Sequence, residues 1–107
     1  METFTNPKTR EKLELAPKDL VGKMTLQQAK DACRELGNGW RLPTIPELEI
    51  IYTDFHKKDK GEFKKKDCYW SGSMSPDNWV LAFDFSDGRS YINVENFLNR
   101  VRVVRPV

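Results

Sequence analysis

One stretch decides the fold of this chain, and it reads Gly39-Trp40-Arg41-Leu42-Pro43-Thr44-Ile45-Pro46-Glu47-Leu48. Pro43 disfavours a helical conformation at Leu42 and so fixes where the chain turns. Thr44 and Glu47 have the spacing of a capping box, in which a Thr hydroxyl and a Glu carboxylate satisfy free amides at the start of a helix. The stretch therefore predicts a packed junction that leads into a helix, with Trp40 as a core anchor rather than a ligand platform.

Helices are predicted on both sides of this junction. Residues 25–36 begin with a second capping-box spacing, Thr25 and Gln28, and carry apolar side chains on one helical face. Gly37 suits the end of this helix. Residues 44–55 form the second predicted helix. Its buried face is expected to hold Leu48, Ile51, Tyr52 and Phe55.

Strands are predicted before and after the two helices. Residues 3–15 contain two short β-prone runs around a turn, and residues 68–73 form a further strand. Residues 79–85 alternate in type with period two, and Asp87-Gly88 has the signature of a hairpin that returns through 90–94. A last strand is predicted at 101–105. Helices grouped before a run of strands indicate an α+β fold, and 107 residues suit a single domain, 1–107.

Composition excludes several classes of function. The 18 Lys and Arg residues nearly balance the 16 Asp and Glu, and a net charge of +2 gives no basis for nucleic-acid binding. No apolar run is long enough to span a membrane. The first residues lack a signal-peptide pattern, so we expect a cytoplasmic protein unless a leader was removed, in which case it is extracellular or periplasmic. The oligomeric state does not follow from the sequence.

A lysine-rich run, 56–67, is the most polar part of the chain. We interpret it as a solvated surface loop whose lysines are partly balanced by nearby acids, and contact with a polyanion is the alternative. It begins with His56, the one histidine, which has no cysteine or carboxylate cluster at metal-ligand spacing. No metal site and no cofactor are therefore expected.

Catalytic patterns are missing from the sequence. One histidine without a Gly-flanked serine does not make a Ser-His-Asp set. The six glycines are scattered and form no phosphate-binding loop. We predict that the chain is not an enzyme.

Five sequence blocks together resemble a known family. They are Thr25–Cys33, Trp40–Leu48, Tyr69–Ser73, Phe83–Gly88 and Val101–Arg105. Over residues 25–105 the chain is similar to the C-terminal domain of bacterial collagen-like adhesins, a family otherwise catalogued as a domain of unknown function. The resemblance implies a C-type-lectin-like fold, with two helices packed on a twisted antiparallel sheet and the terminal strands close together.

Two departures from the family pattern bear on function. The family often pairs the cysteine of the first helix with one in the last strand, where Val103 stands here. That leaves Cys68 as the one possible partner of Cys33 and weakens an extracellular assignment. Calcium-dependent lectins use a Glu-Pro-Asn-like triplet. The segment 76–79, Pro-Asp-Asn-Trp, shares residue types with it but not their order, so no calcium site is expected.

The resemblance directs the search for a ligand site to loops at one end of the sheet, because loops carry recognition on a rigid scaffold. The candidate ligand-binding residues are Asn78, Trp79, Asn93, Asn96 and Phe97. Amides and aromatic faces suit a sugar or a protein loop. The alternative is that both aromatics are core and the asparagines stabilise turns.

The predicted function is a non-enzymatic binding module that recognises a glycan or a protein ligand. The alternative is a structural or assembly domain of a larger bacterial surface or phage-related protein, with no small ligand.

Other conspicuous residues are assigned to the fold itself. Trp40, Pro43 and Trp70 are expected in the core, and Ser71 is expected to hydrogen-bond at the junction. Asp84 alternates with aromatics in a strand, which predicts a partly buried carboxylate paired with an arginine. The candidate arginines are Arg41, Arg102 and Arg105.

Overall fold

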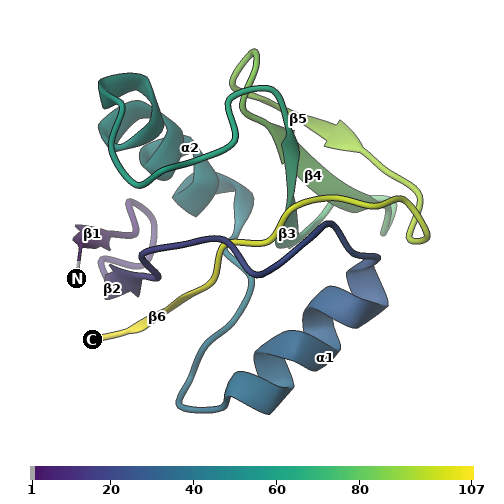
Figure 1. The fold of residues 1–107 in the computed structure, drawn as a ribbon, viewed down its shortest axis with the longest axis horizontal. Coiled ribbons are helices and arrows are strands. Elements are labelled where there is room, and N and C mark those ends of the chain that lie inside the picture. The colour runs from purple at the N-terminus through teal and green to yellow at the C-terminus, as the bar shows by residue number, and fades with distance from the viewer. Residues whose placement is uncertain (1) are drawn as a thin grey trace.

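The computed structural model describes residues 2–107 and confirms the α+β class (Figure 1). Two α-helices and a short 3-10 helix lie against two antiparallel three-stranded sheets. The elements in chain order are β1 (Thr3–Thr5), β2 (Lys12–Leu15), α1 (Leu26–Leu36), α2 (Ile45–Asp54), η1 (His56–Lys58), β3 (Cys68–Met74), β4 (Val80–Asp84), β5 (Arg89–Ile92) and β6 (Val104–Pro106).

The first sheet joins the two ends of the chain. Its strand order is β1-β2-β6, and Leu15 of β2 lies opposite Val104 of β6. The chain therefore enters and leaves on the same side of the molecule (Figure 1), which confirms that the terminal strands are close together. The second sheet has the order β3-β4-β5, so the strands are divided between two sheets rather than forming one.

The two helices begin where their capping boxes predict. Thr25 caps α1, because its hydroxyl accepts a hydrogen bond from the Gln28 amide at 3.2 Å. Thr44 caps α2 in the same way, with its hydroxyl 3.4 Å from the Glu47 amide nitrogen. Since these contacts join residues three apart, local sequence is enough to specify them.

The core has two parts, one beneath each helix. The part beneath α2 is largely aromatic and includes Phe83 and Phe85 of the β4 hairpin. The part that packs against α1 is centred on Trp70, whose indole nitrogen donates to the Met24 carbonyl at 2.7 Å. Val101 and Val103 complete it, although the backbone there forms no regular strand and β6 begins only at Val104.

The lysine-rich run is less simple than the sequence predicts. Residues 56–58 form the short helix η1, and Phe63 is buried in the aromatic core. The Arg102 guanidinium lies 4.0 Å from the centre of the Phe63 ring. The lysines themselves remain at the surface, as the ion pair of Lys65 with Asp59 shows. The solvated-loop prediction is therefore wrong for Phe63, because tertiary packing draws this residue inward.

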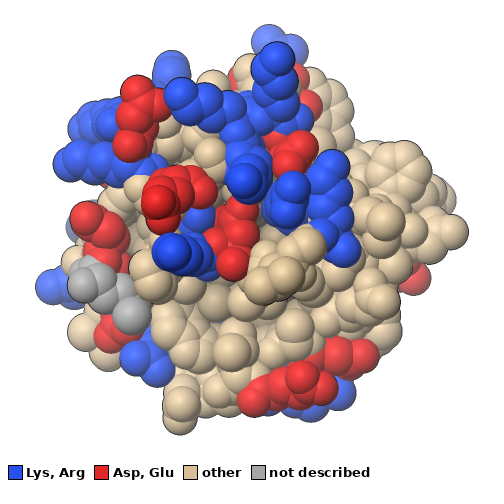
Figure 2. Space-filling model, in the orientation of Figure 1, with Lys and Arg blue, Asp and Glu red and all other residues tan. Residues whose placement is uncertain are grey.

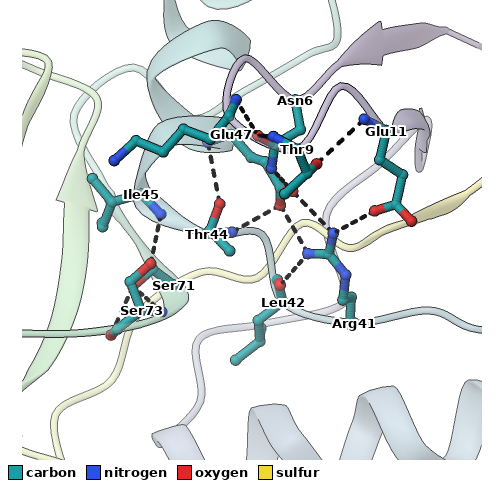
Figure 3. Close-up of polar contacts among 11 residues, drawn as sticks. Asn6, Thr9, Glu11, Arg41, Leu42, Thr44, Ile45, Glu47, Ser71 and Ser73 are labelled. Carbon is teal, nitrogen blue, oxygen red and sulfur yellow. Dashed lines mark hydrogen bonds and ion pairs between the residues drawn. The ribbon is translucent and has the colours of Figure 1, made fainter.

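The junction at residues 39–48 is closed by a buried carboxylate. Glu47 has no solvent-exposed side-chain surface, and Arg41 binds both of its oxygens, at 2.8 and 2.9 Å (Figure 3). The side-chain amide of Asn6 donates to the same carboxylate at 2.6 Å, and the backbone amide of Thr44 donates at 2.9 Å. The turn around residue 6 and the junction at residues 39–48 therefore meet on one side chain.

The charge state of Glu47 follows from this environment. Burial alone disfavours the ionised form, but the hydrogen bonds from Arg41, Thr44 and Asn6 outweigh it, so the pKa of Glu47 lies below its usual value of 4.5. The hydrogen bonds to Glu47 raise the pKa of the Arg41 guanidinium despite its partial burial. Removing one partner would leave the other charge uncompensated, which is costly in the interior.

A second buried arginine ties the last part of the chain to the early connector. Arg102 is almost fully buried, and its Nε donates to Asp19 at 2.7 Å. The Tyr69 hydroxyl donates to the other oxygen of the same carboxylate at 2.6 Å. Burial and that carboxylate both raise the pKa of Tyr69 above its usual value, so the phenol stays protonated as a donor.

The predicted pairing of Asp84 with an arginine is wrong. Arg41 pairs with Glu47, Arg102 with Asp19, and Arg105 with Glu14 at 3.2 Å. Asp84 instead accepts hydrogen bonds from the backbone and hydroxyl of Ser86, at 2.8 and 2.6 Å. It is the last residue of β4, so its side chain shapes the hairpin turn rather than entering the core.

Replacement of Arg41 tests the buried pair. We expect Arg41→Met to lower the free energy of unfolding by roughly 3 kcal/mol, the low end for a broken buried pair, because Arg41 is itself 36% exposed. Urea unfolding followed by circular dichroism measures the change. Arg34→Met is the matched control, since Arg34 makes only an exposed pair with Asp31 and should change stability by less than about 0.5 kcal/mol. Equal losses in the two variants would contradict the special role of Arg41.

Acid should weaken the same junction. Because the folded-state pKa of Glu47 lies below 4.5, its stabilising contribution is complete above pH 4.5 and is lost as the pH falls through the lower folded value. Urea midpoints recorded over an acid series should therefore fall more steeply in wild type than in Glu47→Gln, which has no carboxylate to protonate. Parallel curves for the two proteins would show that Glu47 does not titrate with folding.

Candidate ligand-binding groove

The turn between β3 and β4 presents an indole to solvent. The amide of Ser75 donates to the Trp79 carbonyl at 2.9 Å, and the amide of Asn78 donates to the Ser75 carbonyl at 2.9 Å. Asn78 has a φ of 64°, in the left-handed region that asparagine tolerates better than most residues. The turn is thus a fixed structure, and it leaves the Trp79 side chain 55% exposed.

The loop that follows β5 is fixed at both ends. The amide of Asn93 donates to the Val80 carbonyl at 3.0 Å, and the Glu95 carbonyl accepts from Leu26 at the start of α1, at 3.1 Å. The buried side chain of Asn99 donates to the Asn93 side-chain oxygen at 3.2 Å, which orients that amide. The loop is therefore held against the scaffold by the strand on one side and the helix on the other.

These two loops enclose a groove of about 440 Å³. Its lining residues are Asn78, Trp79, Val80, Asn93, Val94, Glu95 and Asn96. Four of the five sequence-predicted ligand residues therefore lie together. The fifth, Phe97, is 57% exposed but does not line the groove. Neither aromatic belongs to the core, so the interpretation of Trp79 and Phe97 as buried anchors is wrong.

The chemistry of the groove is that of a neutral polar site. Each asparagine offers two N–H donors and a carbonyl acceptor, and the indole offers a flat apolar face. Glu95 supplies the one carboxylate among the lining residues, and no lysine or arginine lines the groove. Within residues 2–107, no three His, Cys, Asp or Glu side chains come together as a metal-binding group.

The residues assigned to the fold lie mostly where the sequence places them. Trp70, Pro43 and Ser71 are buried, and the Ser71 hydroxyl donates to the Leu81 carbonyl at 2.7 Å. The hydroxyl of Ser73, rather than that of Ser71, contacts the start of α2 by accepting from Ile45 at 2.9 Å (Figure 3). Trp40 is only partly buried, with the Arg105 guanidinium 4.5 Å from its ring centre.

Several residues that hold the scaffold or the groove in place carry no clear local signal. Asn6 and Asp19 lie in a turn and a connector, yet each binds a buried charged side chain far along the chain. Asn99 is buried and orients Asn93. Polar residues in loops usually contact solvent, so their burial follows only from the tertiary fold.

A second hollow of about 370 Å³ lies between α1 and the junction. Its lining residues are Lys30, Cys33, Arg41, Leu42, Thr44 and Gly72. The two terminal nitrogens of Arg41, Nη1 and Nη2, are already engaged by Glu47 and the Leu42 carbonyl. The lining therefore adds the Lys30 ammonium as a polar group, whereas the groove brings three asparagine side chains together.

Comparison with solved structures defines the class of fold. The chain superposes on botrocetin with a TM-score of 0.63 at 12% identity, covering 99% of this chain and 95% of that one. A chain from the complex of botrocetin with a von Willebrand factor A1 domain mutant gives a TM-score of 0.57 at 11% identity, covering 91% of each chain. The protein therefore has the C-type-lectin-like fold that the sequence resemblance implies.

The family follows from sequence. The profile of the Lcl C-terminal domain matches residues 8–105, and the chain belongs to that family. Sequence comparison with curated proteins gave no match. Across the described residues 2–107, no helix is long and apolar enough to cross a membrane.

The two cysteines give a test of the scaffold around these sites. Both are free thiols, and burial raises the pKa of Cys33. Burial and the neighbouring Asp84 carboxylate raise the pKa of Cys68 to about 11. At pH 8 the thiolate fraction of Cys68 is then on the order of one in a thousand. We expect slow reaction with a disulfide reagent in the native protein and rapid reaction of both thiols in denaturant. Absence of free thiol in denaturant would show that the cysteines are bonded to each other.

Proposed function

We propose that the domain is a non-enzymatic recognition module that binds a neutral glycan in the groove between the β3–β4 turn and the loop after β5. The observation that carries the proposal is the exposed Trp79 indole beside three asparagine side chains. Trp79 and Val94 are both exposed and both line the groove, and an exposed apolar surface rimmed by polar side chains is typical of a binding site. The groove volume suits a small saccharide unit.

A sugar complements both parts of this surface. Its C–H face is apolar and packs on a flat aromatic ring, while its hydroxyls donate and accept hydrogen bonds at the ring edge. The amides of Asn78, Asn93 and Asn96 can serve as both donors and acceptors. Because the turn and the loop are already held by backbone hydrogen bonds, binding requires little further ordering.

The charge of the groove lining favours some classes of glycan over others. Glu95 repels sulfate and carboxylate groups, and the lining residues include no cation to bind them. Lysine and arginine side chains gather instead in the upper half of Figure 2, whereas the right-hand end, toward the loop after β5 in Figure 1, shows few charges. Neutral or amino sugars therefore fit this groove better than sulfated or acidic ones.

A protein ligand is the second candidate. Met74, Phe97 and Leu98 are exposed apolar side chains that lie close in sequence to the groove residues. One of the similar structures is botrocetin in complex with the von Willebrand factor A1 domain, so a relative in fold binds a protein. A role within a larger bacterial surface protein, as in adhesins, accommodates either kind of ligand.

Replacement of the indole tests the proposal. On an array of immobilised neutral, amino and sulfated oligosaccharides, we expect wild type to bind neutral or amino sugars and Trp79→Ala to lose at least about 2 kcal/mol of binding free energy. Since Trp79 is exposed, the thermal midpoint should change little.

Tyr91→Ala is the matched control, because Tyr91 is an exposed aromatic that does not line the groove. Its binding should equal that of wild type. Binding confined to sulfated sugars, or equal losses in the two variants, would contradict a neutral-glycan site at Trp79.

A further inference from the structure

One charged side chain lines the groove, and the rest of the chain leaves it without a partner. Glu95 and Asn96 are the central residues of a turn, which closes where the Phe97 amide donates to the Val94 carbonyl at 3.1 Å. The Glu95 side chain is exposed. Across residues 2–107, no lysine, arginine or histidine lies within ion-pair distance of its carboxylate. The carboxylate is therefore available to a ligand.

The nearby start of α1 does not bind this carboxylate either. A helix N-terminus attracts anions through backbone amides that lack a partner within the helix. The Leu26 amide donates instead to the backbone carbonyl of Glu95, at 3.1 Å. The Gln28 amide donates to the Thr25 hydroxyl at 3.2 Å, and the Thr25 amide donates to the Gln28 side chain at 2.9 Å. These three amides are satisfied without the carboxylate.

A positive charge suits both the carboxylate and the indole that shares the groove with it. Trp79 is 55% exposed and lines the groove together with Glu95. Tryptophan is the aromatic side chain that attracts a cation most strongly, through the negative potential over its ring face. Because no lysine or arginine lines the groove, the lining itself supplies no cation for either group. A cation can therefore come from the ligand.

The asparagines indicate which kind of cation fits. Asn78, Asn93 and Asn96 offer donors and acceptors that suit hydroxyl groups. A sugar that bears a free amine carries an ammonium group, several hydroxyls and an apolar C–H face, so it can use every group of the lining. Its N-acetylated form has lost the charge. A lysine side chain of a protein supplies the ammonium group but no hydroxyls.

We propose that the groove prefers a glycan without acidic groups whose bound unit is an amino sugar with a free, protonated amine, and that Glu95 determines this preference. The inference rests on the function proposed above and narrows its ligand. The ammonium group pairs with the Glu95 carboxylate while the C–H face packs on Trp79 and the hydroxyls bond to the asparagine amides. A neutral sugar makes only the last two kinds of contact, so it binds less tightly.

Calorimetric titration of the full chain with two oligosaccharides tests the proposal. The probes are oligomers of glucosamine and of N-acetylglucosamine with the same number of units, in a weakly acidic buffer that keeps the amines protonated. We expect wild type to bind the glucosamine oligomer roughly ten-fold more tightly, since its ammonium group adds an ion pair and an attraction to the indole. This ratio of affinities should fall as salt is added, because salt screens exposed charges.

Two variants isolate the contribution of the carboxylate. Glu95→Gln removes the charge and keeps the size of the side chain, so the ratio should fall to about three-fold or less, the share left to the indole. Asp77→Asn is the matched control, because Asp77 is exposed and adjoins Asn78 in sequence but does not line the groove. Its ratio should stay within about two-fold of the wild-type ratio.

Three results would overturn the proposal. They are equal binding of the two oligomers by wild type, an equal fall of the ratio in Asp77→Asn and Glu95→Gln, and binding of a lysine oligomer through Trp79 as tight as that of the glucosamine oligomer. The last result would identify a protein ammonium group as the ligand.

Trp79→Ala separates this inference from the proposed function. If wild type binds both oligomers equally and Trp79→Ala loses both, glycan recognition at the groove stands and the amine preference fails. If Trp79→Ala binds both oligomers as wild type does, the groove is not the site and both proposals fail.

Discussion

The structure depends on one buried carboxylate. Glu47 caps α2 through Thr44, binds Arg41 with both oxygens and accepts from Asn6. A buried charge is tolerated only when it is fully paired, so the turn that supplies Asn6 and the junction that supplies Arg41 and Thr44 must meet in one arrangement. This constraint places α2 against the β1–β2 turn, and hence the aromatic core beneath α2. The ion pair of Arg102 with Asp19 likewise fixes the last part of the chain against the connector before α1.

The proposed recognition groove and the buried networks of the scaffold occupy different parts of the molecule. The buried networks lie around the junction and beneath the lysine-rich run. The groove forms from two loops at the far end of β4, and those loops are fixed by backbone hydrogen bonds and by Asn99. The groove residues can therefore vary without disturbing the ion pairs that stabilise the fold. This division suits a module whose ligand specificity resides in its loops.

Much of this arrangement could be predicted from the sequence, and the reasons for success and failure are physical. The helix starts at Thr25 and Thr44 were predictable because capping contacts span only three residues. The capping spacing of Glu47 does not reveal that its carboxylate is buried. Its contacts with Arg41 and Asn6 were therefore not predicted. Phe63 was missed because a run of lysines indicates solvent exposure, while its ring packs under Arg102.

Prediction of the groove residues from sequence succeeded and failed for similar reasons. Four of the candidate ligand residues were found from their place in loops that the resemblance assigns to one end of the sheet, and they line the groove. The partial burial predicted for Asp84 is confirmed, but its pairing with an arginine was wrong, because alternation with aromatics does not reveal that a carboxylate at the end of a strand bonds within the turn. The contribution of Glu95 to the groove, and its consequence for charged ligands, required the three-dimensional arrangement.

The most direct test of the central claim is a nitrogen–proton correlation spectrum of the labelled protein titrated with neutral oligosaccharides. The groove predicts shifts confined to the Trp79 indole N–H and to the side-chain amides of Asn78, Asn93 and Asn96, with the signals of the lysine-rich run unchanged. Shifts confined to the lysine-rich run, or no shift with any neutral sugar, would contradict glycan recognition at this groove.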